Sequence, residues 1–182
     1  MKVDPGSSVE KNAPLAIPVV LAIALVVLPF VTRDAASFLL TMIFVLLVIL
    51  LGLVDYLTLR IPNVIVFSGI LFMLVGTTLV DITLLPDAAI GAGAILAITF
   101  ALALVARGSM GMGDVKFSCL VGASLGLIFG ILALAVGFVV GAIGALILVL
   151  LGRRGRGDML PLTPSLAVGA ILITLMFGTV VT

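Results

Sequence analysis

The chain has 182 residues, of which 64% are hydrophobic and only 9% are charged, with a formal net charge of +1. This composition lies far outside that of soluble globular domains, so the chain is predicted to be an integral membrane protein whose main solvent is the lipid bilayer. The absence of His and the single Cys, Cys119, exclude His-based nucleophiles, His-ligated zinc or haem, and an intrachain disulfide. The few charges are scattered, which argues against a nucleic-acid partner.

The N-terminal part of the sequence changes from polar to apolar within a few residues. Residues 1–12 are polar and are predicted to form a tail. The apolar stretch 15–31 is long for a secretory signal, and no convincing cleavage site follows it before Ser37. We therefore expect a retained first span, and we expect residues 13–182 to form a single transmembrane domain. Three further spans, separated by polar or Pro-containing breaks, are predicted at residues 36–54, 64–80 and 88–106.

The second half of the chain contains an uncharged segment, residues 117–152, that is too long for one membrane span. Two helices are expected to share it, with the turn near residues 126–130, where two glycines lie. A last span is predicted at residues 166–181. The sequence thus predicts an all-α polytopic membrane protein with about seven transmembrane helices.

The distribution of basic residues predicts the orientation, because loops that face the cytoplasm are enriched in Lys and Arg. A cytoplasmic N-terminus brings almost all of the nine basic residues to the cytoplasmic side, namely Lys2, Lys11, Arg60, Arg107, Lys116, Arg153, Arg154 and Arg156. Only Arg33 falls on the other side. A single span over residues 117–152 would weaken this asymmetry, which favours the seven-helix arrangement.

Two aspartates at predicted helix ends are the candidate functional groups, because acidic residues at a membrane boundary are costly to desolvate. Asp55 ends the second predicted span, shortly before Pro62, which disfavours helix at the residue before it. Asp114 opens the fifth span after two glycines, Gly111 and Gly113, and Asp is a favoured N-cap residue. The predicted topology puts both carboxylates at the cytoplasmic face, where they could meet.

Two opposed carboxylates can hydrolyse a peptide bond without His, since one takes a proton from water while the other donates a proton to the substrate carbonyl. A Gly-x-Gly-Asp sequence alone also forms a generic turn and helix cap, so the second aspartate is what favours catalysis. Three alternatives stay open at this point: a small ion-coupled transporter or channel, a structural membrane scaffold, and a protease that uses Ser109 or Ser118 with Lys116.

The residues around both aspartates resemble the type IV prepilin peptidases and archaeal preflagellin peptidases, which are membrane aspartic proteases of the GxGD type. Asp55 followed by Ile61-Pro62-Asn63 is similar to the D-x5-IPN element of this family, and residues 111–116, Gly-Met-Gly-Asp-Val-Lys, are similar to its GxGDVK element. A looser similarity covers residues 161–170, a Pro-x-x-Pro segment with Leu-Thr where Phe-Gly is often found.

The resemblance implies that Asp55 and Asp114 are the catalytic pair of a single peptidase domain, and that no cofactor or metal is needed. Other residues that match the motifs are expected to shape the site: Ile61, Pro62, Asn63, Gly111, Gly113 and Lys116. Lys116 has an alternative role as a basic anchor at the membrane surface. The implied partners are prepilin-like or preflagellin precursors, whose short basic leaders are cut at the cytoplasmic face of the cell membrane.

The chain also departs from the long bifunctional bacterial members of this family. It lacks their cysteine-bearing N-terminal region, so peptidase activity without methylation is expected. The first span is extra relative to the six-helix core of the family. The sequence indicates neither the oligomeric state nor whether the short bacterial or the archaeal enzymes are more similar.

Overall fold

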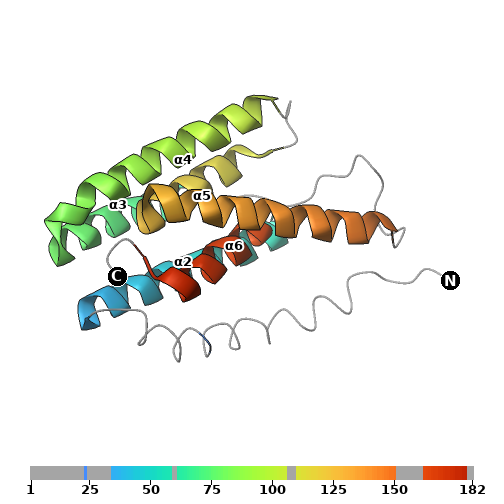
Figure 1. Cartoon of the computed structure of the whole chain (residues 1–182). Helices are drawn as coiled ribbons and strands as arrows, with labels where there is room; N and C mark the ends of the chain where they lie inside the picture. Colours follow the sequence, from blue (N-terminus) through green and yellow to red (C-terminus); the bar gives the residue numbers. More distant parts are fainter. Residues whose placement is uncertain (1–22, 24–33, 59–60, 106–109, 151–161, 180–182) are drawn as a thin grey trace.

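The computed structural model describes residue 23 and residues 34–58, 61–105, 110–150 and 162–179, and within these residues the protein is helical and contains no strand (Figure 1). The elements in chain order are α2 (Ala35–Thr58), α3 (Asn63–Val80), the 3-10 helix η1 (Ile82–Leu84), α4 (Leu85–Val105), α5 (Met112–Leu150) and α6 (Thr163–Phe177). Each predicted span that falls within the described residues corresponds to an observed helix. The ends of these helices differ from the predicted ends by a few residues.

Four of the described helices are long and apolar enough to cross a membrane: α2, α3, α4 together with η1, and α5. The chain is therefore a multi-pass membrane protein. Helix α6 is apolar but has only 15 residues. The predicted first span, residues 15–31, lies outside the described residues apart from Ile23. The number of seven spans and the cytoplasmic N-terminus stay predictions.

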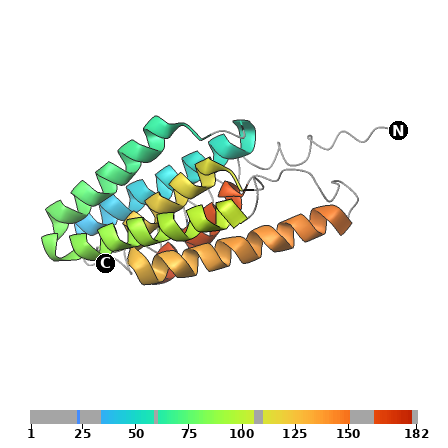
Figure 2. The ribbon, with the colours of Figure 1, turned by 90° about the horizontal axis from the view of Figure 1, so that it is seen from above.

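Helix α5 is divided at Gly126, whose backbone angles, φ 71° and ψ −169°, are not helical. These angles fall in a region that is open to Gly and closed to almost every other residue. The chain reverses direction there, and the second half of α5 runs back towards the end of the molecule at which the first half begins (Figure 2). A Cβ atom added at Gly130 would lie 3.4 Å from the Cα of Gly122, so the two halves are in close contact. The break confirms the predicted turn near residues 126–130 and, within the described residues 117–150, the division into two helices.

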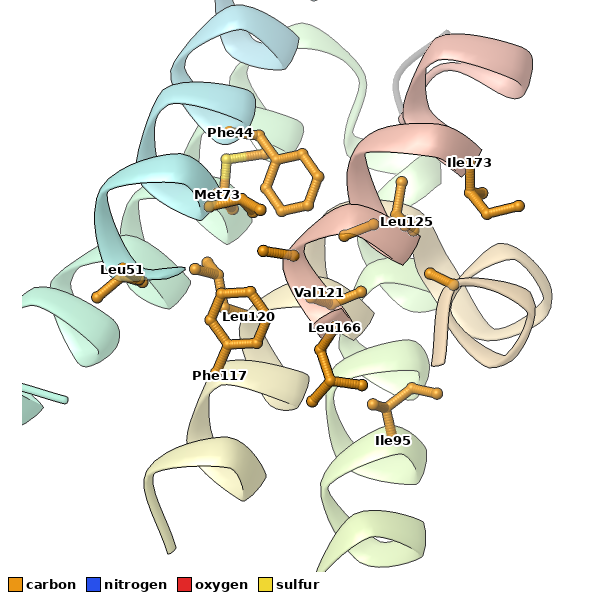
Figure 3. Close-up of a cluster of buried hydrophobic side chains, with 14 of the residues drawn as sticks. Phe44, Leu51, Met73, Ile95, Phe117, Leu120, Val121, Leu125, Leu166 and Ile173 are labelled. Atoms are coloured by element: carbon orange, nitrogen blue, oxygen red, sulfur yellow. The ribbon is translucent and has the colours of Figure 1, made fainter. Parts of the chain in front are cut away.

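The core lies between the helices and is formed by large apolar side chains that are almost completely buried (Figure 3). Every long helix contributes to it: Phe44 and Leu51 from α2, Met73 from α3, Ile95 from α4, Phe117 and Leu120 from α5, and Leu166 from α6. Many other large apolar side chains remain exposed, such as Leu79 and Val105 at 82% and 79%. In a bilayer such side chains face lipid tails, which are as apolar as Leu itself.

Small residues let α6 pack closely against both α2 and α5. A Cβ at Gly52 of α2 would lie 3.2 Å from the Cβ of Ala167 and 3.8 Å from the Cα of Pro164. A Cβ at Gly137 of α5 would lie 2.8 Å from the Cα of Leu166, closer than real Cβ atoms approach. Close backbone approach through small residues is a common way for membrane helices to associate. The N-terminal part of α6 is thereby held between the C-terminal part of α2 and the second half of α5.

Candidate active site

Asp55 lies in the last turn of α2, which ends at Thr58 and so continues four residues beyond the predicted end at Val54. Its side chain is 8% exposed, although an Asp is almost never buried without a partner. Residues 59 and 60 are not described, and α3 starts directly after Pro62, whose φ of −65° and ψ of 119° are extended. Asp55 is thus a buried acid close to the end of a membrane helix.

Asp114 lies in the first turn of α5 and is also 8% exposed. The helix starts at Met112, and the carbonyl of Gly111 accepts the backbone N–H groups of Asp114 and Val115 at 3.1 and 3.4 Å. The N–H of Gly111 in turn donates to Oδ2 of Asp114 at 3.1 Å. Asp114 is therefore not the N-cap residue that the sequence suggested. It is the third helical residue, whose side chain reaches back to the cap position, as in a capping box.

Thr163, the first residue of α6, connects the two aspartates. Its hydroxyl donates a hydrogen bond to Oδ1 of Asp114 at 2.5 Å, and it also interacts with the Asp55 carboxyl group. Asp55 and Asp114 are close enough to repel each other electrostatically. The structure thus brings the two predicted residues together at one end of the helices, with a buried hydroxyl group between them.

The two sequence motifs also contact each other directly at Ile61 and Gly113. A Cβ added at Gly113 would lie 3.1 to 3.3 Å from three side-chain atoms of Ile61, so Gly leaves the space that this side chain fills. Pro62 separates Ile61 from α3 and keeps it out of the helix. Ile61 and Gly113 therefore pack one motif against the other. The roles of Ile61, Pro62 and Gly113 in shaping the site stay predictions.

Lys116 and Asn63 join the same motifs a second time. Nζ of Lys116 donates to Oδ1 of Asn63 at 2.8 Å, and it lies 5.8 Å from the centre of the Phe67 ring. The hydrogen bond is exposed. Lys116 thus has a specific partner, beyond the general role of a basic anchor at a membrane surface.

The alternative pair of a serine and Lys116 is not assembled at Ser118. The Ser118 side chain is fully buried, and its hydroxyl donates to the backbone carbonyl of Asp114 at 2.8 Å. Lys116 instead points to Asn63. Ser109 lies outside the described residues.

Sequence reasoning did not assign a role to Thr163. The segment that contains Thr163 resembles the family through its Pro-x-x-Pro pattern, and it has Leu-Thr where the family often has Phe-Gly. A buried hydroxyl among apolar residues is a weak signal, because Ser and Thr in membrane helices commonly bond the backbone of their own helix. Only the packing of α6 shows that this hydroxyl faces two carboxyl groups.

Fold and site together define a multi-pass helical membrane protein with a buried pair of carboxyl groups at the ends of two helices. Among the residues that the structure describes, no three His, Cys, Asp or Glu side chains gather closely enough to hold a metal ion. The profile of the type IV leader peptidase family matches residues 42–146, which is more than half of the chain. The chain belongs to this family. The matched range contains both aspartates and ends before Thr163.

No significant match was found among curated proteins or among solved structures. Family membership identifies a peptidase of the leader-peptidase type and a membrane setting for prepilin-like substrates. The transporter or channel alternative finds no support, since the profile is that of a peptidase and both acids lie in terminal turns of continuous helical segments.

Proposed function

We propose that this protein is an aspartic endopeptidase that removes the leader peptide of prepilin-like or preflagellin precursors at the cytoplasmic face of the cell membrane. The observation that carries the proposal is the buried pair formed by Asp55 and Asp114, which interact with each other and with one hydroxyl group. Burial of two like charges is unfavourable unless a proton is shared or a ligand is bound, so such pairs are typical of functional sites.

The hydrogen bonds of the pair suggest different roles for its two members. Both carboxylate oxygens of Asp114 accept a hydrogen bond, one from Gly111 and one from Thr163. Bonds donated to a carboxylate favour its charged form, so Asp114 is proposed to be the ionised base and Asp55 the protonated acid. Two carboxyl groups in different protonation states are what acid–base hydrolysis requires.

The proposed reaction begins with a water molecule held between the two carboxyl groups. Asp114 takes a proton from this water while the oxygen of the water attacks the carbonyl carbon of the scissile bond. At the same time Asp55 gives its proton to the carbonyl oxygen. The resulting gem-diol collapses when one hydroxyl returns its proton to Asp55 and the proton held by Asp114 passes to the leaving nitrogen. The C–N bond then breaks, and both aspartates regain their starting states.

The site also has features that suit a precursor protein with a basic leader and an apolar segment. It lies at helix ends, where a substrate can keep charged residues in water while its apolar part stays in the bilayer. Exposed Tyr56 and Leu57 follow Asp55 and present apolar surface at this end. The half-buried Lys116, whose hydrogen bond is exposed, lies at the same end, which supports a cytoplasmic location because basic residues are enriched on that side.

The test is cleavage of a co-expressed prepilin or preflagellin precursor, read as a mobility shift on gels. Wild type is expected to cut, whereas Asp55→Asn and Asp114→Asn are expected to fail while still inserting in the membrane. Asp87→Asn is the matched control, because Asp87 is an exposed acid in the first turn of α4. Normal cutting by either Asp55→Asn or Asp114→Asn would show that the proposed mechanism is wrong.

A further inference from the structure

We infer that Thr163 is a positioning residue that orients the two carboxyl groups and sets which of them holds the proton. The inference rests on the proposed aspartic mechanism and extends it to a residue outside the matched family range. Thr163 is fully buried and bonds Asp114, so it is expected to act through the carboxyl groups.

The Thr163 hydroxyl differs from four other buried hydroxyls within helices, which bond the carbonyl one turn earlier in their own helix, at Thr99, Ser118, Ser124 and Thr174. A further buried hydroxyl, that of Thr41 in α2, shares a hydrogen bond with the hydroxyl of Thr179 rather than with a carboxyl group. Thr163 is fully buried but donates across helices, from α6 to Asp114 of α5. It takes no part in capping α6, where Leu162 occupies the N-cap without a side-chain bond and the Ser165 hydroxyl donates to the Leu162 carbonyl.

A hydroxyl group has a single proton to donate. In the structure this proton is donated to Oδ1 of Asp114. The same hydroxyl lies next to the Asp55 carboxyl group, but one proton cannot serve both acids at once. The bond to Asp114 thus favours an ionised Asp114 over an ionised Asp55, which is the state that the proposed mechanism needs before water is activated.

The packing of α6 holds the hydroxyl in this position. The close approach of Gly52 to Pro164 and Ala167 lies one turn before Asp55 on α2 and directly after Thr163 on α6. The contact of Gly137 with Leu166 fixes α6 against α5. Rigid supporting elements keep catalytic groups aligned. Helix α6 can therefore determine the geometry of the Asp55–Asp114 pair, although neither aspartate belongs to α6.

The experiment compares Thr163→Val, which keeps the shape and removes the hydroxyl, with Thr163→Ser, which keeps the hydroxyl. Cleavage of a purified prepilin precursor is measured in detergent as kcat and KM over a range of pH. For Thr163→Val we expect kcat to fall about ten-fold or more while KM changes little, because a hydrogen bond to a charged group is lost. The acidic limb of its pH–rate profile should move to higher pH, since the ionised carboxylate loses a donor.

Thr163→Ser should restore kcat to within about three-fold of wild type, together with the wild-type pH profile. Thr174→Val is the matched control, because it makes the same chemical change at a buried position of α6 whose hydroxyl bonds only the carbonyl of Ala170. It should leave both readouts unchanged.

Wild-type kcat and an unchanged pH profile in Thr163→Val would overturn the inference. A fall in kcat that Thr163→Ser does not rescue, with an unchanged profile, would also overturn it, since loss of packing would give this result. Either result leaves the proposed function intact as long as Asp55→Asn and Asp114→Asn remain inactive. Full activity of those two variants would instead refute the proposed function, and with it the basis of the inference.

Discussion

Lys116 and Asn63 are 53 positions apart in the chain, yet Nζ of Lys116 lies 2.8 Å from Oδ1 of Asn63. This bond joins the start of α3 to the first turns of α5, and the contact of Ile61 with Gly113 joins the same two segments. Each motif therefore positions the other. Substitutions at Asn63 or Ile61 are therefore expected to affect cleavage through the placement of Asp114.

The hydrogen bond between Lys116 and Asn63 can be tested by a double-mutant cycle. Lys116→Met and Asn63→Ala are each expected to lower kcat/KM several-fold, and the double variant should be little worse than either one. The expected coupling energy is about 1 kcal/mol, because the bond is exposed to solvent and one partner is charged. Strictly additive effects of the two substitutions would show that the bond does not contribute to cleavage.

Gly113→Ala should lower cleavage without lowering stability. The added Cβ would meet Ile61 at 3.1 Å and push it away, whereas Ala within the first turn of a helix is favoured over Gly by up to about 1 kcal/mol. Cleavage rates and thermal unfolding in detergent give the two readouts. Adding Ile61→Ala removes the two closest contacting atoms and should restore part of the activity. A variant that is simply less stable would contradict this explanation.

Gly126→Ala should destabilise the protein, because its φ of 71° and ψ of −169° strain any residue with a Cβ. We expect a loss of about 1–3 kcal/mol in the free energy of unfolding. Gly93→Ala is the matched control, since Gly93 is helical and a Cβ there meets nothing within 4 Å. It should be neutral or stabilising. Equal thermal unfolding temperatures for the two variants would argue against a strained turn at Gly126.

Asp81 should make the stability of the loop before α4 depend on pH. The hydroxyl and the backbone N–H of Thr83 both donate to its carboxylate and hold the pKa of Asp81 below the ordinary value of 3.8. A carboxylate with a lowered pKa in the folded protein contributes stability above its unfolded pKa and loses it as the pH falls through the folded pKa. Asp81→Ala should therefore lower the unfolding temperature at neutral pH and make little difference once the pH is below the pKa of Asp81 in the folded protein. A difference that stays constant across this range would contradict the assignment.

Several features of the protein could be predicted because they depend on local composition. Long uncharged segments show where membrane helices lie, and Pro62 shows that α2 ends before it. The two aspartates stood out because charges are rare in such a sequence. Their predicted location at the same end agrees with their interaction in the structure.

Other features depended on packing between distant segments. The capping role of Gly111 could not be distinguished from that of Asp114, since both residue types are favoured at helix starts. The hydroxyl of Thr163 had no distinguishing local pattern, because its partner Asp114 is 49 positions away.

The amino-acid sequence by itself determined that this chain enters a membrane and where its helices lie, and it placed two of its eight acidic residues, Asp55 and Asp114, near helix ends. These properties follow from the cost of burying charge and from the length of apolar segments, which are local quantities. Only the tertiary structure decided that α6 brings Thr163 between the two carboxyl groups. That arrangement depends on close contacts of small residues on three helices, and the geometry of such contacts is not encoded in any one segment.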